Sequence, residues 1–372
     1  MRYQNPLLEL FCVGDDWQAI NGFAGADLKF FQNFGGYFSP SSGLYISTNY
    51  RSSQSIVGIG NALMDGLGKP AIAHKTSVGQ VLLADLSEFE PSVVEKQRHP
   101  GDIITPVVLR LASKALADGL AVVLLCRRNG IPWFVNYQDQ GSEGSRGLEH
   151  YLDLVRAFFP KGLRERITIS TAHKYKGLEK PMVIVLDAVA RSYPLIHPDW
   201  AFSRILGDSP NKITEEARRL FYVALTHGVE KLVIVTDKAN YSAFLDDIQR
   251  KVKVPAINWL DFPPVRGPIS RVVVKIGNQE AKGFGSTLAI KDSLRAVGYQ
   301  WQTTGWKGWA KSYPAEGFSI EVLKDEIWAA AADGIDVRVF DDHDAPIACY
   351  LVDAGRWHCI NNELPKLHGV DS

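Results

Sequence analysis

The chain has 372 residues, of which 46% are hydrophobic and 22% are charged, and its 41 basic residues balance 41 acidic ones. This composition excludes a disordered or collagen-like chain, and the length predicts two or three domains. Because the formal net charge is zero, a nucleic-acid partner would need a local basic surface rather than a generally basic protein.

No apolar run approaches the ~18 residues that cross a bilayer, and the first ten residues lack the pattern of a signal peptide. The four cysteines are scattered and form no CxxC pair, so the sequence indicates neither a zinc site nor a disulfide framework. These features are typical of a cytoplasmic protein with reduced thiols, and no membrane partner is expected.

Short apolar runs alternate with segments of helical periodicity through about the first 240 residues. Most of the runs are apolar throughout, as expected of strands that helices cover on both faces. The alternation predicts an α/β fold with a doubly wound parallel sheet, whose ligands bind at the carboxyl ends of the strands. Strands are predicted at residues 10–13, 80–86, 121–126, 167–171, 182–187 and 231–236, and helices at 54–66, 107–119, 147–159 and 214–228.

The composition changes near residue 255, where residues 254–268 contain four prolines and predict a linker. Beyond it we expect a small α+β module at residues 268–355, followed by a tail. Its strands are predicted at residues 269–276, 306–314 and 335–341, and its helices at 286–299 and 319–334.

Aromatic side chains gather around two lysines in this module. They either form the core of a small domain or stack on the bases of single-stranded DNA, and the core interpretation is slightly favoured. The group comprises Tyr299, Trp301, Trp306, Trp309 and Tyr313, with Lys307 and Lys311 between them.

Four segments place polar side chains at the ends of predicted strands or helices, where donors can converge on phosphate. Between residues 161 and 180, six basic residues stand against two acidic ones, a local charge of +4 that suits an anionic partner. The segments are VGDDWQAINGFAGAD at residues 13–27, STNYRSSQSI at 47–56, ITISTAHKYKGLEKPMVIVLD at 167–187 and EEARRLFYVALTHGVEKLVIV at 215–235.

Each segment also has a purely structural interpretation. Asp15 and Asp16 suit a turn after a strand, and the basic loop suits a solvated face. Arg219 suits an i,i+4 pair with Glu215 on an amphipathic helix. Taken singly, none of the segments decides between structure and function.

Taken in order, the segments resemble those of superfamily 1 DNA helicases of the UvrD/Rep type, with the closest similarity to the helicase IV branch. GDDWQAI resembles motif III, TNYRSS motif IV, TAHKYKGLE motif V and EEARRLFYVALT motif VI. The resemblance covers roughly residues 5–240. It implies a RecA-like parallel sheet of the P-loop NTPase type, and ATP-driven movement 3′ to 5′ along single-stranded DNA.

The resemblance also implies roles for individual residues at the nucleotide. Gln18 would sense the γ-phosphate, Tyr50 would stack on adenine, and Arg51 would act as an arginine finger. Glu179 would lie near the ribose or the γ-phosphate. The implied catalytic set is Gln18, Arg51, Arg219 and His227, and the implied nucleotide-binding set is Asp15, Asp16, Gln18, Tyr50, Arg51, Gly177 and Glu179.

A second set of residues is implied at the DNA. Phe23 matches a position where the family places an aromatic that stacks on a base. Thr171 and His173 would face the strand, and Lys174 and Lys176 would contact phosphates. Single-stranded DNA is therefore the expected polymer partner.

The sequence departs from the family in what it does not contain. It has neither a GxxxxGK[ST] loop nor a DExxD segment, which hold the phosphates and Mg²⁺ in the family. We expect both upstream of Met1 or in a separate partner chain. ATP and Mg²⁺ are the expected cofactors, with no metal ligand predicted within this chain.

Further departures lie inside the motifs. Motif VI usually reads ALTR, whereas this chain has His227 at the place of the arginine. Histidine is mostly neutral at pH 7 and lacks the guanidinium fork, so that slow hydrolysis is expected unless Arg218 or Arg219 compensates. Asn21 and Ala24 replace an aromatic and a frequent arginine of motif III, and weaker DNA contact is expected.

These observations predict a division of the chain and leave three functions open. The chain is a DNA helicase part, a non-enzymatic DNA-binding or partner-dependent subunit, or a truncated inactive helicase fragment. The predicted parts are a remnant of a first RecA-like domain at residues 1–46, a second RecA-like domain at 47–250, a linker at 251–267, the module at 268–355 and a tail at 356–372.

Overall fold

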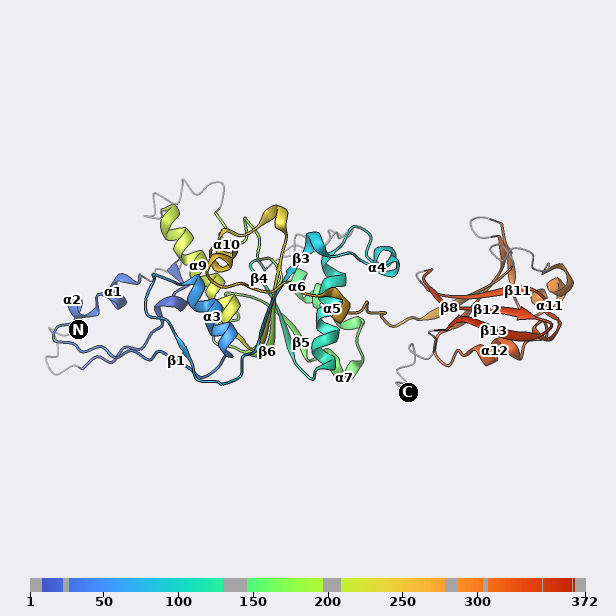
Figure 1. Ribbon diagram of the computed structural model, residues 1–372, viewed down its shortest axis with the longest axis horizontal. Helices are drawn as coiled ribbons and strands as arrows, with labels where there is room; N and C mark the ends of the chain where they lie inside the picture. Colours follow the sequence, from blue (N-terminus) through green and yellow to red (C-terminus); the bar gives the residue numbers. More distant parts are fainter. Residues whose placement is uncertain are drawn as a thin grey trace. The chain divides into compact units, whose positions relative to one another are not determined.

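The computed structural model describes residues 9–22, 27–129, 146–196, 209–277, 287–303, 307–342, 344–362 and 364 (Figure 1). The chain forms two compact units. The first comprises residues up to 90 together with 102–156 and 160–263, and the second comprises 91–101, 157–159 and the residues from 264 onward. The second unit thus includes two short segments that lie, in sequence, between elements of the first.

A five-stranded sheet forms the centre of the first unit, and all of its strands are parallel. Every residue of its strand β4 is buried, as expected for a strand that is covered on both faces. The predicted parallel α/β sheet is therefore confirmed. The strand order is β3 (Gln80–Asp85), β7 (Gly228–Thr236), β6 (Lys180–Val185), β4 (Val122–Cys126) and β5 (Ile167–Thr171).

Helices lie on both sides of this sheet (Figure 1). Val123 and Leu125 of β4 share one hydrophobic cluster with helices α3, α9 and α10, so the alternate residues of β4 face the opposite side, where α5 contacts the strand. The helices are α3 (Gln54–Leu63), α5 (Ile104–Ala117), α6 (Arg146–Ala157), α7 (Lys161–Arg164), α9 (Pro210–Thr226) and α10 (Ala243–Lys251).

Helix α9 begins where its sequence provides a start signal. The hydroxyl of Ser209 accepts a hydrogen bond from the amide of Lys212 over 3.2 Å, and Pro210 occupies the first turn, where no amide donor is needed. The buried residues of α9 extend to Thr226 at its carboxyl end. This helix therefore carries its buried face directly to the sheet edge where β7 begins.

The amino-terminal part of the first unit differs from the prediction. Residues 10–13 form no strand, and the side chains of Phe11 and Val13 are 93% and 80% exposed. Among the described residues no neighbouring strand offers backbone groups for pairing, which explains the failed prediction. The elements here are η1 (Asp16–Gln18), α1 (Lys29–Gln32), α2 (Phe34–Tyr37) and β1 (Thr48–Asn49), the last paired in parallel with β2 (Ile72–Ala73).

A six-stranded antiparallel sheet forms the second unit. Residues 356–362, expected in the tail, form its edge strand β13. The strand order is β13 (Arg356–Asn362), β12 (Pro346–Asp353), β11 (Ile335–Asp341), β8 (Arg271–Gly277), β10 (Gly308–Pro314) and β9 (Gln300–Gln302). The unit also contains α4 (Val93–Arg98), α11 (Lys291–Ala296) and α12 (Ile320–Lys324).

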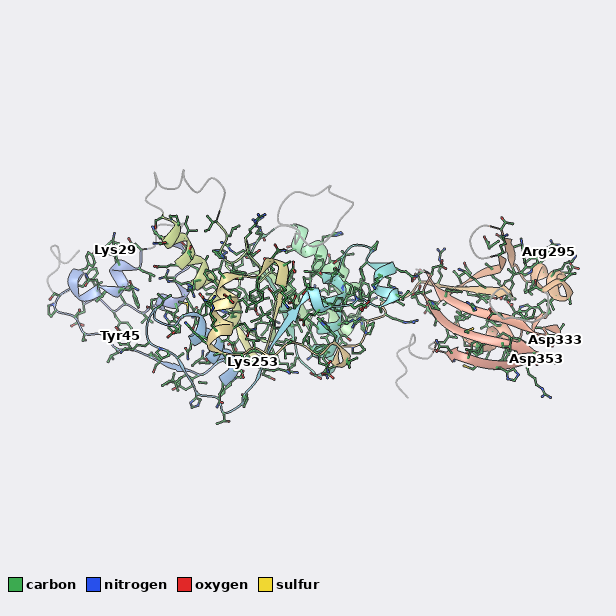
Figure 2. All side chains as sticks on the ribbon, turned by 45° about the horizontal axis from the view of Figure 1, so that its top comes forward. Lys29, Tyr45, Lys253, Arg295, Asp333 and Asp353 are labelled. Carbon is green, nitrogen blue, oxygen red and sulfur yellow. The ribbon has the colours of Figure 1, made fainter. Side chains whose placement is uncertain are left out.

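Aromatic side chains build the core of this second unit. Trp309 and Trp328 are buried, while Trp301 is 49% exposed and packs edge to face on Trp309. Arg295 of α11 lies over the ring of Trp309 (Figure 2). The core interpretation thus holds for Trp309, whereas Trp306 lies outside the described residues.

A buried ion pair joins α4 to the antiparallel sheet. Arg98 Nη2 lies 2.6 Å from a carboxylate oxygen of Asp341, and both side chains are almost fully enclosed. Asp341 also accepts a hydrogen bond from the amide of Ala345. This pair fixes the segment at residues 91–101 within the second unit. Within the described part of the chain, no helix is both long and apolar enough to cross a membrane.

Candidate functional site

Four segments that are far apart in the sequence meet around the loop that leaves the carboxyl end of β5 and runs to the amino ends of β6 and β7. Lys176 Nζ donates to the carbonyl oxygen of Gln18 over 2.7 Å, and Arg51 Nε lies 3.0 Å from a carboxylate oxygen of Glu179. The amide of Gly177 donates to Nε2 of His227 over 3.3 Å. The structure therefore brings together all four segments that the sequence analysis identified.

The first segment is anchored by Trp17. Its buried indole donates to the carbonyl of Leu67 over 2.8 Å and packs edge to face on Tyr222 of α9, with ring centroids 5.3 Å apart. Asp15 caps the short helix η1, because its carboxylate accepts from the amide of Trp17 and, over 2.6 Å, from the side-chain amide of Gln18. Gln18 is thus held beside Lys176 by its own backbone.

Asp16 begins η1 and is half-buried. Farther along, the amide of Gly22 donates to a carboxylate oxygen of Glu216 on α9 over 3.0 Å. The segment is therefore fixed to α9 at two places, through Trp17 and through Gly22.

The second segment turns sharply after β1. The side-chain oxygen of Asn49 accepts from the amides of Arg51 and Ser52, each over 2.9 Å, which closes an Asx turn. The buried hydroxyl of Ser52 donates to the carbonyl of Gly228 over 2.8 Å. These bonds tie the backbone of Arg51 to the residues that follow α9.

Tyr50 precedes this turn and remains 64% exposed. Its ring lies 4.6 Å from the ring of His74, at an interplanar angle of 45°. The aromatic pair offers an exposed surface next to Arg51.

The third segment is a compact loop after β5. The hydroxyl of Thr171 accepts from the amide of Lys174 over 3.3 Å, and its carbonyl accepts from the amide of Tyr175 over 3.0 Å. Gly177 has a φ of +88°, a conformation that favours glycine. The loop then reaches Glu179, which is exposed apart from its pairing with Arg51.

On α9 the two arginines lie in different surroundings. Arg219 pairs with Glu215 over 3.2 Å, one turn earlier on the same helix. Arg218 donates to the carbonyl of Leu63, pairs with Asp247 of α10 over 2.8 Å and lies over the ring of Phe244. Arg218 therefore joins α9 to α3 and α10 rather than reaching the site.

His227, predicted to be catalytic, is completely buried. Its Nδ1 lies 2.5 Å from the carbonyl oxygen of Val223, and its Nε2 accepts from Gly177. Burial lowers the pKa of His227 to about 4. Both ring nitrogens are therefore engaged with the backbone, and the ring is neutral at pH 7.

The residues predicted to contact DNA are placed as follows. Phe23 lies outside the described residues. The side chain of Thr171 is buried and bonded within its own turn. His173 lies 3.4 Å from Arg127, and its pKa is lowered to about 4 by burial and by that cation. Lys174 is exposed, with Nζ 3.4 Å from the side-chain oxygen of Asn129.

The basic run does not form a single patch. Strand β5 separates residues 161–166, which precede its amino end, from Lys174 and Lys176, which follow its carboxyl end. Because five residues of a strand span roughly 16 Å, the two groups lie at opposite edges of the sheet. Only the second group belongs to the site.

Sequence reasoning missed a buried polar group at the carboxyl edge of the sheet, where the loop after β5 begins. Asp187 follows β6 and accepts from the amide of Arg127, which follows β4, over 2.9 Å. Burial raises the pKa of Asp187 to about 6, although the amide and the charge of Arg127 oppose this shift. Both residues directly follow apolar runs, so the rule that ligands bind at the carboxyl ends of strands would have found them.

Neither Asp187 nor its neighbours form a metal site. Among the residues described, no group of three or more His, Cys, Asp or Glu side chains could hold a metal ion. The arrangement therefore provides cations, an exposed aromatic pair and backbone donors, which suit an anionic ligand with an aromatic base.

Residues 153–239 match the family of the UvrD-like helicase C-terminal domain. The match includes the loop after β5 and the whole of α9, and thus two of the four converging segments. This part of the chain is thus similar to a UvrD-like helicase C-terminal domain. The predicted resemblance to UvrD/Rep-type proteins is confirmed, and the domain supports a function within the helicase family.

Two relatives that the chain resembles are named as helicases. It is 29% identical to a probable DNA helicase of Mycoplasma pneumoniae over 236 residues, which are 61% of this chain and 38% of the relative. It is 25% identical to DNA helicase IV of Escherichia coli over 284 residues, which are 72% of this chain and 34% of the relative. The chain thus spans little more than a third of the length of these relatives.

A similar solved structure is that of the C-terminal domain of a possible DNA helicase from Lactobacillus plantarum. It is 14% identical, and the alignment covers 54% of this chain and 94% of that chain with a TM-score of 0.30.

Proposed function

We propose that this chain forms the part of an ATP-dependent DNA helicase that spans motifs III to VI, and that the assembled enzyme moves 3′ to 5′ on single-stranded DNA. The observation that carries the proposal is the convergence of the four segments. Arg51 meets Glu179, and Lys176 meets the backbone of Gln18, over 3.0 and 2.7 Å. Such links couple a nucleotide site to a polymer site through the loop after β5.

The nucleotide is assigned to the surface around Tyr50 and Arg51. The exposed ring of Tyr50 suits an adenine base, and the partly exposed guanidinium of Arg51 suits the charge of a γ-phosphate. Glu179 holds that guanidinium in place until a phosphate competes for it.

Mg²⁺ does not fit the described residues, because no acidic cluster among them could hold it. ATP with Mg²⁺ supplies the phosphoryl-transfer chemistry in this proposal. The phosphate loop and the metal ligands then come from polypeptide outside residues 1–372. This chain contributes the groups that bind the base and neutralise charge.

Single-stranded DNA is assigned to the loop after β5. Lys174 and Lys176 are exposed there, and hydrogen bonds fix the backbone of the loop that carries them. Exposed lysines on a rigid loop suit phosphates of a polynucleotide without regard to base sequence.

A partner-dependent or inactive subunit is the second candidate, and the amino-terminal region favours it. Phe11, Val13 and Leu44 are 80% to 98% exposed in segments without strand pairing. Tyr45 is exposed as well (Figure 2). The ammonium group of Lys69 lies over its ring. Such a group of exposed apolar side chains is unusual for an isolated protein and suits a surface that another chain covers, such as one that supplies the phosphate loop.

Binding of a fluorescent ATP analogue to the purified chain tests the nucleotide assignment. Tyr50→Ala and Arg51→Ala should each weaken binding about tenfold, because each removes roughly 1–3 kcal/mol of stacking or charge interaction. Arg250→Ala, which removes an exposed arginine of α10, is the matched control and should leave binding unchanged. Unaltered binding in both site variants would overturn the assignment.

ATP hydrolysis tests what the two candidates share, namely that the phosphate loop lies outside residues 1–372. The chain alone is expected to show little turnover, with or without single-stranded DNA, because positioning of the phosphates and Mg²⁺ provides most of this catalysis. DNA-stimulated turnover by the chain alone would show a phosphate site within it and would contradict both candidates in this respect.

A further inference from the structure

His227 lies where the carboxyl end of α9 meets the loop after β5. The carbonyl of Val223 faces Nδ1 at 2.5 Å, and the amide of Gly177 faces Nε2 at 3.3 Å. A carbonyl only accepts hydrogen bonds, and an amide N–H only donates them. The ring must therefore carry its proton on Nδ1 and leave Nε2 free to accept, which is one neutral tautomer.

The groups around the ring keep it neutral on balance. The pKa of His227 is lowered to about 4, with burial as the largest cause. The charges of two cations act in the same direction, whereas a carbonyl and a carboxylate raise the pKa. The ring of Tyr175 closes the remaining side, with centroids 5.9 Å apart. The facing charged and titratable groups are Arg51, Lys176, Glu179 and Tyr175, together with the carbonyl of Val223.

The bond to Gly177 falls at the centre of the third segment. Lys176, the residue before Gly177, donates to the carbonyl of Gln18, and Glu179, two residues after it, pairs with Arg51. Gly177 itself adopts a φ of +88°. An amide that is fixed at this position determines where both neighbouring side chains begin.

We propose that His227 is a positioning residue, which as a neutral imidazole fixes the Gly177 amide to the end of α9 and so holds Lys176 and Glu179 against Gln18 and Arg51. This role differs from a direct contact with phosphate, for which the ring has no free nitrogen. The consequence for the nucleotide and DNA sites rests on the proposed function, whereas the link between His227 and Gly177 does not.

An arginine cannot take this place. A guanidinium has five donors and no acceptor, so it would leave the Gly177 amide without a partner and would bring a permanent charge into a fully buried position. The histidine is thus matched to its slot, in which one donor and one acceptor are needed.

Two amide variants separate the two bonds of the ring. The side-chain oxygen of glutamine reaches the place of Nε2, so His227→Gln can still accept from Gly177. Asparagine reaches only the place of Nδ1, so His227→Asn can still donate to Val223 but loses the link to the loop. The pair differs by a single methylene group, which makes each variant the control for the other.

Hydrogen exchange of the Gly177 amide, measured by NMR on the full chain, reads the link directly. We expect His227→Gln to exchange within about threefold of the natural chain and His227→Asn to exchange about tenfold faster or more. Equal exchange rates in the natural chain and in His227→Asn would overturn the proposal. Thermal melting of both variants shows whether each remains folded.

The imidazole signals of the natural chain give a test that needs no variant. With ¹⁵N-labelled histidine, His227 should show the neutral tautomer protonated on Nδ1 and no titration between about pH 5.5 and pH 8. A ring that titrates near pH 6.5, or that carries its proton on Nε2, contradicts the proposal.

These readouts also separate this inference from the proposed function. Exchange and tautomer report on the loop alone, whereas binding of the ATP analogue reports on the nucleotide assignment. If Tyr50→Ala and Arg51→Ala leave analogue binding unchanged while His227→Asn frees the Gly177 amide, the positioning role stands and the nucleotide assignment fails.

Discussion

Two polar clusters in this molecule have opposite characters. In the second unit, Glu326 accepts from Lys311 and Tyr313, each over 2.6 Å, and from the indole of Trp328 over 2.5 Å. All of these partners lie within one unit, and Trp328 is fully buried. We call this group the Glu326 cluster.

Around the loop after β5, polar contacts join segments more than a hundred residues apart, such as Lys176 with Gln18. Here several buried polar atoms have no hydrogen-bond partner among the described residues, including Asp187 Oδ1, Arg127 Nε and the hydroxyl of Tyr175. A cluster that satisfies itself stabilises a fold, whereas one with unsatisfied groups has capacity for a ligand. The comparison therefore predicts stability effects in one region and binding effects in the other.

The largest effect is expected from Trp328→Ala in the Glu326 cluster. Loss of a fully buried indole leaves a cavity and an unsatisfied carboxylate, which should reduce the free energy of unfolding by about 3–5 kcal/mol. Chemical denaturation measures this change. Binding of single-stranded DNA at a temperature where the variant remains folded should be unchanged, and a loss of binding would place the Glu326 cluster in the function instead.

A somewhat smaller loss is expected from His227→Arg. The buried guanidinium finds no acceptor toward Gly177, so the free energy of unfolding should fall by about 3 kcal/mol. From the sequence alone, an arginine at this position would be expected to raise turnover, because the family carries ALTR there. Faster turnover together with undiminished stability would favour that expectation over the positioning role.

The pH dependence of stability should sharpen the comparison further. Because the pKa values of His173 and His227 are lowered to about 4 in the folded state, their stabilising contribution is complete above pH 6.5 and is lost as the pH falls toward 4. Asp187, with its pKa raised to about 6, acts in the opposite sense, since its contribution is lost as the pH rises from 3.8 to 6.

Melting temperatures recorded across this pH range should therefore fall toward acid, and His227→Gln should flatten the decline because it removes one of the two histidines. A pH profile of His227→Gln that matches the natural chain would mean that the ring already titrates normally.

The strands differ in how far the sequence alone predicts them. The parallel strands could be predicted because most of them are continuous apolar runs. Such runs are expected of strands that are covered on both faces. The strand expected at residues 10–13 has the same apolar character, but a strand needs a neighbour to pair with, and sequence pattern does not supply one. Strand β13 was missed for the converse reason, because its residues are mostly polar and exposed at a sheet edge.

The site was predictable at the level of segments and less so at the level of side chains. The segments converge because the loop after β5 leads to the amino end of β6, beside the amino end of β7 where α9 ends. His227 shows the limit, because the resemblance points to a phosphate contact while the donors and acceptors of its backbone neighbours are set by three-dimensional packing. Thr171 likewise turns its hydroxyl into its own loop.

The smallest effect on stability, and a clear one on binding, is expected from Lys174→Ala. Lys174 is exposed and makes only one long contact, so the free energy of unfolding should change by less than about 0.5 kcal/mol. If the loop contacts phosphates, the slope of log affinity for oligo(dT) against log salt should fall by about one. Fluorescence anisotropy at several salt concentrations measures it.

Lys161→Ala is the matched control for this prediction, since Lys161 is an exposed lysine of the same basic run at the opposite edge of the sheet. If the run acted as one basic patch, both variants would reduce the salt dependence equally. If only the carboxyl edge binds DNA, Lys174→Ala alone should reduce the salt dependence. A phosphate within reach of the loop after β5 lies roughly the length of the strand away from Lys161. This separation exceeds a Debye length at physiological salt.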